Sequence, residues 1–253
     1  MSGLALAIRQ VGYENRAFWR NPPAAFFTFA FPLLFMLIFN VIFGADAARF
    51  FTPAIIVFSV VTATFTNLAM NITFARDAGV LKRIRGMPLP AWAYLAGRIG
   101  HAIAVTLLLV AIVAAVGALL YDVPIPWDAA PIILLVLAVS AAAFSALGLA
   151  VAGLMPNADA APAIVNAIVL PVLFVSNVFI QMDNAPGWLN SISYVLPVRH
   201  FADAMLDLYA SGADAGVPWT ALGVIAAWGA AGIAAALRFF SWEPRRGSPL
   251  DEP

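Results

Sequence analysis

The chain has 253 residues, of which 63% are hydrophobic and 10% charged, and its formal net charge is zero. A soluble domain carries about a quarter charged residues, so this composition excludes that class, and the low charge together with 19 Phe excludes a disordered chain. The absence of cysteine excludes disulfides, a thiol nucleophile and Cys-ligated zinc or iron–sulfur sites. We therefore expect an all-α integral membrane protein.

The N-terminal segment, residues 1–23, is predicted to contain an amphipathic helix over residues 4–20. At about 100° per residue, one side of this helix is apolar and the opposite side is basic. The apolar side holds Leu4, Ile8, Val11, Phe18 and Trp19, and the basic side holds Arg9, Arg16 and Arg20. This pattern is typical of a helix in the membrane interface, although a charged tail is the alternative. Pro22 and Pro23 are expected to end it before the chain enters the bilayer.

Six stretches without Asp, Glu, Lys or Arg are long enough to cross the membrane. A bilayer core of about 30 Å needs about 20 apolar residues in a helix. The predicted spans are residues 24–44, 51–75, 102–120, 129–155, 160–180 and 217–237. A signal peptide or a buried soluble helix could account for one such run but not for six.

The basic residues predict the orientation of these spans. With the N-terminus inside, 11 of the 13 Lys and Arg residues fall in cytoplasmic segments, and only Arg49 and Arg199 fall outside. Positively charged short loops stay in the cytoplasm, so we expect both termini there. The acidic residues show no such bias. The chain is thus predicted to be a multi-pass protein of the plasma membrane.

Two long connections and a tail complete the predicted topology. The cytoplasmic loop, residues 76–101, is the most basic, and we expect a short helix over residues 77–85 that ends at Gly86. The external segment, residues 181–216, is too apolar for a solvated loop and too broken for a span, which indicates a re-entrant or interfacial helix pair. Residues 238–253 form a cytoplasmic tail.

Catalytic constellations are missing from the sequence. The two histidines, His101 and His200, are predicted to lie on opposite sides of the membrane, so they cannot share a metal. Neither a HExxH zinc motif nor a Gly-x-Ser-x-Gly nucleophile elbow occurs, and the phosphate-binding GxxxxGK[ST] loop is absent. We expect no enzyme activity, no cofactor and no metal in this chain, and no nucleic-acid partner.

Neutral polar residues lie inside two of the predicted spans. Thr64, Asn67 and Asn71 share one face of the second span, and Asn166, Ser176 and Asn177 lie on the fifth. One interpretation is hydrogen bonding between helices of the bundle. The other is a polar strip along a substrate path, for which Asn67, Asn71, Asn166, Ser176 and Asn177 are the candidates.

The chain resembles the permease subunits of ABC-2 type exporters, particularly an actinobacterial drug-resistance branch. Residues 77–88, which read DAGVLKRIRGMP, are similar to the acidic-x-Gly-x-Leu…Arg…Pro loop of that family. Residues 171–179 and the later Pro-Gly-Trp-Leu and Pro197 resemble its fifth span and external segment. Asp77 replaces a common glutamate and Asn177 a usual glycine. The similarity covers nearly the whole chain, so residues 1–253 are expected to form one ABC-2 type transmembrane domain.

The resemblance implies a function and partners. The chain would be the permease of an exporter of a hydrophobic or amphiphilic molecule, powered by two copies of an ATP-binding subunit that holds the ATP and Mg. A second permease chain, identical or not, would complete the complex in the lipid bilayer. The cytoplasmic loop would dock on the ATP-binding subunit, with Leu81 and Ile84 filling a groove on it. The implied coupling residues are Asp77, Gly79, Leu81, Lys82, Arg83, Ile84, Arg85 and Pro88.

Two alternatives remain open from the sequence. The first is export of a lipid-linked glycan or wall polymer, for which Phe58, Phe65, Phe74 and Phe174 are available as channel-lining aromatics. The second is a membrane scaffold that recruits an ATPase without transport. Substrate-stimulated ATP hydrolysis in the complex distinguishes a transporter from such a scaffold.

Overall fold

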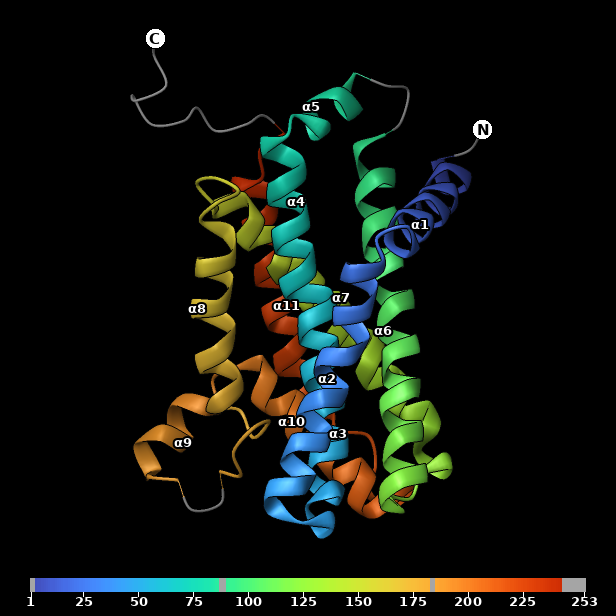
Figure 1. The fold of residues 1–253 in the computed structure, drawn as a ribbon. Coiled ribbons are helices and arrows are strands. Elements are labelled where there is room, and N and C mark those ends of the chain that lie inside the picture. The colour runs from blue at the N-terminus through green and yellow to red at the C-terminus, as the bar shows by residue number, and fades with distance from the viewer. Residues whose placement is uncertain (1–2, 87–89, 183–184, 243–253) are drawn as a thin grey trace.

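A computed structural model describes residues 3–86, 90–182 and 185–242, and these residues form helices and connecting segments without a strand (Figure 1). The helices are α1 Gly3–Trp19, α2 Pro22–Phe43, α3 Ala48–Val61, α4 Asn67–Asp77, α5 Val80–Arg85, α6 Ala91–Tyr121, α7 Ala130–Leu154, α8 Ala161–Phe174, α9 Gly187–Ser193, α10 Pro197–Ser211 and α11 Trp219–Phe239. Short turns η1 Ala45–Ala47, η3 Trp127–Ala129 and η4 Gly212–Ala215 join some of them, and the π-helical turn η2 Thr62–Thr66 joins α3 to α4.

Five helical stretches are long and apolar enough to cross a membrane. They are Ala25–Phe43, Ala45–Asp77, Trp92–Tyr121, Trp127–Leu154 and Trp219–Phe239. Each overlaps one of the predicted spans. The remaining predicted span, residues 160–180, contains α8, which has 14 residues and is therefore about 21 Å long. The helix ends at Phe174, and three residues later Asn177 takes a left-handed backbone conformation, with φ of 61°, that an α-helix does not accommodate.

The third long helix begins earlier than the sequence predicts. The apolar run starts at residue 102, but α6 starts at Ala91, directly after Pro90, and so takes in residues 91–101 of the predicted cytoplasmic loop. The charged side chain of Arg98 is tolerated in this extension because it pairs with Glu14 of α1. The length of the apolar run alone therefore underestimates the length of this helix.

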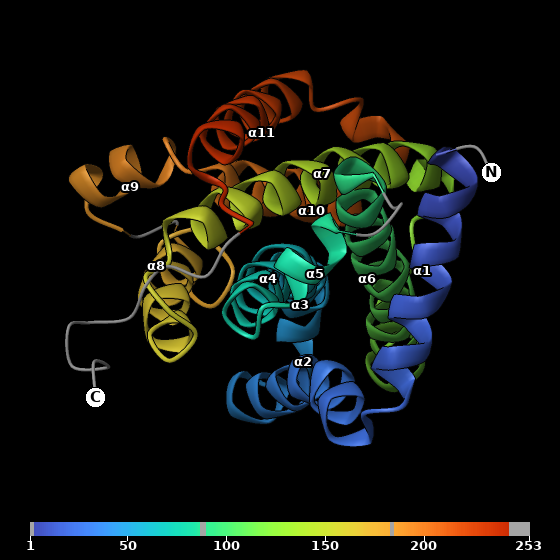
Figure 2. The same ribbon diagram turned by 90° about the horizontal axis from the view of Figure 1, so that it is seen from above.

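The second crossing, formed by α3, η2 and α4, is the centre of the bundle. Seen from above, α2, α6, α7 and α8 surround it (Figure 2). Within it, α3 is buried from Phe51 to Val61, and Ile55, Ile56 and Val57 are fully buried in the main hydrophobic core. Burial on all sides explains why this part of the crossing is mostly apolar around its circumference, whereas α4 carries Asn67 and Asn71.

Helices α7 and α11 approach each other closely because small residues line their contact. A Cβ atom added at Gly232 would lie 2.9 Å from the backbone nitrogen of Leu147, and one added at Gly229 would lie 3.0 Å from Cα of Ala143. Small residues at such contacts let membrane helices pack backbone to backbone. The pair forms one wall of the bundle.

Helix α1 lies beside α6 (Figure 2). Ala7, Gln10 and Glu14 face α6, where a Cβ atom at Gly97 would overlap Gln10. Leu4 and Ile8 are two-thirds exposed. The helix predicted over residues 4–20 is present, and part of its apolar face is left free to contact lipid.

The ends of the bundle differ in character. Helices α1 and α5 and the end of α11 lie at one end, and α9 and α10 lie toward the other (Figure 1). Residues 181–216, which the sequence predicts to be external, contain the expected pair of short helices, of which α10 is amphipathic and buries Phe201, Met205 and Leu208. The C-terminal tail beyond residue 242 lies outside the described residues.

Candidate functional site

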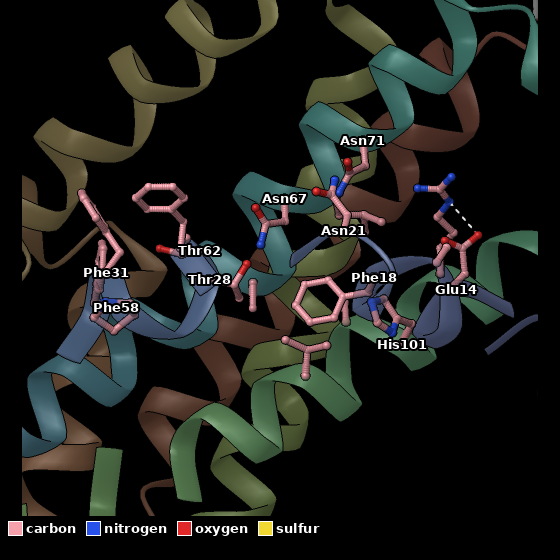
Figure 3. A pocket seen from close by; sticks show the side chains of 18 residues that line it. Glu14, Phe18, Asn21, Thr28, Phe31, Phe58, Thr62, Asn67, Asn71 and His101 are labelled. Atoms are coloured by element: carbon pink, nitrogen blue, oxygen red, sulfur yellow. Dashed lines mark ion pairs between the residues drawn. The ribbon is translucent and has the colours of Figure 1, made fainter. Parts of the chain in front are cut away.

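A cavity of about 600 Å³ opens between α1, α2, α6 and the central crossing (Figure 3). Its lining combines aromatic, neutral polar and charged side chains. The residues are Glu14, Ala17, Phe18, Asn21, Phe27, Thr28, Phe31, Pro32, Phe58, Thr62, Ala63, Asn67, Leu68, Asn71, Arg98, His101, Ala102 and Val105. A volume of about 300–1,000 Å³ is usual for sites that hold small molecules.

The sharp corner between α1 and α2 forms one wall of the cavity. Helix α1 ends at Trp19 and α2 begins at Pro22, where proline fits a first helical turn because its missing N–H has no partner there anyway. Phe18 packs against His101 across the corner, with ring centroids 5.4 Å apart. The predicted break at Pro22 is confirmed, and it places Asn21 at the cavity.

The π-helical turn η2 sets which polar residues of the central crossing reach the cavity. Thr62 and Ala63 of this turn line it, followed by Asn67 and Asn71 of α4. A π-turn inserts an extra residue into the helix and is frequent at functional sites. Thr64, which an ideal helix places on the same face as the two asparagines, is instead fully buried and donates its hydroxyl to the carbonyl of Val60.

Asn67 and Asn71 point into the cavity (Figure 3). Their side-chain amides make no hydrogen bond to the described part of the chain. An amide offers donors and an acceptor together, so both residues keep their full capacity to bind a ligand or water. In this they differ from Thr64 and Thr73, whose hydroxyls donate hydrogen bonds to backbone carbonyls of their own helix.

An ion pair lies at the end of the cavity near α1. Arg98 Nε is 3.2 Å from Glu14 Oε1, and both side chains are largely buried. Gln10 donates a hydrogen bond of 2.9 Å to the same carboxylate oxygen, and Arg98 Nε donates to the Tyr94 hydroxyl. Sequence inspection missed this pair. Glu14 is the one acidic residue of the predicted N-terminal helix, and that isolation was the available signal.

The loop that the sequence predicts to be cytoplasmic forms α5 as expected, but two of its residues face the protein interior. Leu81 is fully buried and Ile84 is 7% exposed, both within a small core that includes Tyr94 and Leu149. The expectation that Leu81 and Ile84 fill a groove on a partner is therefore wrong, because the chain itself covers them. Lys82 and Arg83 are exposed.

The remaining coupling candidates surround this helix. Gly79 precedes α5 with φ of 68°, a left-handed conformation that glycine adopts without strain. The backbone of Arg85 ends α5. The side chain of Arg85 and the whole of Pro88 lie outside the described residues.

Arg76 and Asp77 tie the start of this loop to the connection between α7 and α8. The buried guanidinium of Arg76 donates to the carbonyls of Ala152 at 3.0 Å and Met155 at 2.8 Å. Carbonyls at a helix C-terminus lack partners within the helix, so a cation there is favourable. Asp77 accepts a hydrogen bond from the backbone N–H of Ala158 and pairs with Arg76. The sequence analysis named Asp77 as a coupling candidate but predicted neither this role of Arg76 nor the contact with the α7–α8 connection.

The candidate residues of the fifth predicted span do not join the cavity. Asn166 is exposed on α8, whereas the hydroxyl of Ser176 is buried without a partner among the described residues. Asn177 donates to Asp203 Oδ1 at 2.9 Å and accepts from the N–H of Met182 at 3.1 Å. Arg199, whose Nε donates to Asp203 Oδ2, completes this group, named the external cluster because the sequence predicts its segment to be external.

The external cluster lines a second hollow, of about 390 Å³, which also holds Asp207. Partial burial, with the nearby charge of Asp203, raises the pKa of the Asp207 carboxyl above its ordinary value. No group of three His, Cys, Asp or Glu side chains within residues 3–86, 90–182 and 185–242 is placed to hold a metal ion.

The sequence of the chain is similar to one described protein family and to several known permeases. The sequence profile of the family described as "ABC-2 type transporter" matches residues 11–209. The "Daunorubicin resistance ABC transporter permease protein DrrB1" of Streptomyces coeruleorubidus is 31% identical over 195 residues, or 70% of this chain and 65% of that protein.

Two relatives from Escherichia coli (strain K12) are more distant. The "Probable multidrug ABC transporter permease YbhR" is 23% identical over 177 residues, or 70% of this chain and 48% of that protein. The "Inner membrane transport permease YadH" is 24% identical over 155 residues, or 61% of this chain and 60% of that protein. The match thus spans about half the length of the first and less than two thirds of the second.

Proposed function

The chain belongs to the ABC-2 type transporter family, and from this premise we propose that it is the permease subunit of an ATP-binding-cassette exporter. Its substrate is a hydrophobic or amphiphilic molecule such as a drug, an antibiotic or a lipid. The names of the relatives, "multidrug" and "Daunorubicin resistance", support this class. Two copies of a separate ATP-binding subunit hydrolyse ATP with Mg, and a second permease chain completes the complex.

We propose six crossings in the plasma membrane, with α8 as the short fifth one and both termini in the cytoplasm. The placement of 11 of the 13 basic residues supports this orientation. So does the gathering of α1, α5 and the end of α11 at one end of the bundle (Figure 1). Because α8 is about 21 Å long, shorter than the bilayer core, the segment that follows re-enters the outer leaflet as α9 and α10.

The observation that carries the proposal is the construction of α5. This helix presents Lys82 and Arg83 outward and is anchored from behind by Leu81 and Ile84. Exposed cations on a rigid support suit docking on an acidic surface. Through Arg76 and Asp77, a movement of α5 is passed to the connection between α7 and α8.

The substrate path runs from the cavity beside α1 toward the external cluster. Asn67 and Asn71 line its cytoplasmic half, and Asn177 with Ser176 lies where α8 ends. Asn166, exposed on α8, faces either the second permease chain or lipid. The residues of the cavity and those at the end of α8 come together when the helices rearrange during transport in the complete complex.

Reversal of charge on α5 tests the proposal. The chain is co-expressed with the ABC ATP-binding protein encoded beside it, and Lys82→Glu/Arg83→Glu is compared with Arg9→Glu/Arg16→Glu, an equal charge change on the exposed side of α1. We expect the α5 variant to lose the partner on co-purification and to lose ATP-dependent efflux, whereas the α1 variant keeps the partner. An unmutated chain that binds no ATP-binding subunit would overturn the assignment.

A further inference from the structure

We propose that the cavity beside α1 binds an amphiphile whose polar group is uncharged, with that group near Asn67 and Asn71 and its apolar part against Phe31 and Phe58. The inference rests on the proposed function, since the bound molecule is the exported substrate before its transfer. It goes further by naming the chemical class that the cavity selects. The uncharged polar group is a hydroxyl or amide rather than an amine or a carboxylate.

The charged side chains lie at one end of the cavity, and Phe31 and Phe58 lie at the other. Glu14 and His101 lie toward one end, Phe31 and Phe58 toward the opposite end, and Asn67 lies between them (Figure 3). The charged end is the end nearer α1 and α5. In the proposed topology, an amphiphile from the inner leaflet thus enters with its polar group at the cytoplasmic interface and its apolar part toward the bilayer centre.

The charges of the cavity cancel each other. Glu14 and Arg98 are the charged side chains among the described residues that line it, and they pair with each other. Gln10 and Tyr94 add hydrogen bonds to this pair. A cationic ligand that paired with Glu14 would leave Arg98 unpaired. An anionic ligand that paired with Arg98 would leave Glu14 unpaired. Leaving a partly buried charge unpaired is costly, so an uncharged polar group is preferred.

The unused hydrogen-bonding groups of the cavity suit such a ligand. The amides of Asn67 and Asn71 and the buried Nδ1 of His101 have no hydrogen-bond partner in the part of the chain that the structure describes. A hydroxyl or amide group both donates and accepts, which matches the two capacities of an asparagine side chain. The apolar end supplies aromatic surface from Phe31, half-exposed, and from Phe58, whose ring is mostly buried.

The absence of native cysteine gives a direct test, because a single introduced cysteine is the one thiol that a maleimide can label. The full-length Asn67→Cys chain in phosphatidylcholine nanodiscs is labelled with N-ethylmaleimide. Three probes with the same octyl tail are added below their micelle concentrations: octyl glucoside, octyltrimethylammonium and octanoate. Asn166→Cys, exposed on α8 outside the cavity, is the matched control for partition of the probes into the membrane.

We expect octyl glucoside to slow labelling of Asn67→Cys about threefold at a probe concentration of about twice its Kd. The two charged probes should have less effect, and none of the three should protect Asn166→Cys. Asn71→Cys is the second cavity variant, in case the first does not fold. Equal or stronger protection by a charged probe, or no protection of either folded cavity variant, overturns the inference.

The same preparations separate this inference from the proposed function. A chain that binds its ATP-binding subunit but shows no protection by octyl glucoside refutes the inference and leaves the function standing. Protection of Asn67→Cys in a chain that binds no such subunit supports the binding site and refutes the exporter assignment.

Discussion

The side-chain amide of Asn177 donates a hydrogen bond of 2.9 Å to Oδ1 of Asp203, which joins the segment after α8 to α10 across 26 positions of the chain. The backbone of Asn177 is left-handed, with φ of 61°. Asparagine tolerates this conformation better than other residues with a Cβ atom. One residue therefore turns the chain after α8 and anchors the following segment to α10.

The two roles of Asn177 can be measured separately. Asn177→Gly keeps the backbone conformation and loses the side-chain hydrogen bonds, so we expect it to lower the free energy of unfolding by about 1–2 kcal/mol. Asn177→Ala also strains the backbone and should cost about 1 kcal/mol more. Denaturant unfolding in detergent micelles gives both values. Equal stability of the two variants would show that the left-handed backbone is not maintained.

Removal of the buried guanidinium should weaken the anchor of the cytoplasmic loop. Arg76→Met leaves the carbonyls of Ala152 and Met155 without their donor and Asp77 without its cation. We expect the free energy of unfolding to fall by about 2–4 kcal/mol. Arg83→Met, on the exposed face of α5, is the control and should change stability little. If Arg76→Met leaves the free energy of unfolding unchanged, these hydrogen bonds do not contribute to stability.

A single methyl group should disturb the contact between α7 and α11. The Cβ atom of Gly232→Ala would lie 2.9 Å from the backbone nitrogen of Leu147, so the two helices must separate. We expect a loss of about 1–3 kcal/mol in the free energy of unfolding. Gly223→Ala on the same helix has no atom within 4 Å of its Cβ and should be neutral or stabilising, since alanine favours helix.

Removal of the Asp207 charge should stabilise the chain near neutral pH. Burial and the charge of Asp203 raise the folded-state pKa of Asp207, so the ionised form is disfavoured in the folded protein. This penalty is fully present above the folded pKa, shrinks as the pH falls through it, and vanishes below the ordinary carboxyl pKa. Asp207→Asn should therefore raise the melting temperature at pH 7 and have no such effect at acidic pH. Asp214→Asn on exposed η4 is the control, and a lower melting temperature for Asp207→Asn contradicts the prediction.

Much of the architecture could be predicted because it depends on local properties of the chain. A run of about 20 apolar residues is stable in lipid wherever it occurs, so five of the six predicted spans overlap helices able to cross the membrane. The corner at Pro22 and the short helix α5 follow from proline and glycine, which act on their own backbone. The loop at residues 77–88 and the motifs of the fifth span and the following segment, in that order along the predicted topology, identified the family, and the profile match confirms it.

The meeting of distant side chains was decided only by the tertiary structure. Glu14 finds Arg98, and Arg76 reaches carbonyls 76 and 79 positions away, because helix packing brings them together. The direction in which Leu81 and Ile84 point was likewise invisible in a short amphipathic pattern. Such a pattern shows that one face is to be buried but not which protein buries it. Hydropathy and charge are properties of each residue, whereas a hydrogen bond or a buried face depends on the partner that the fold supplies.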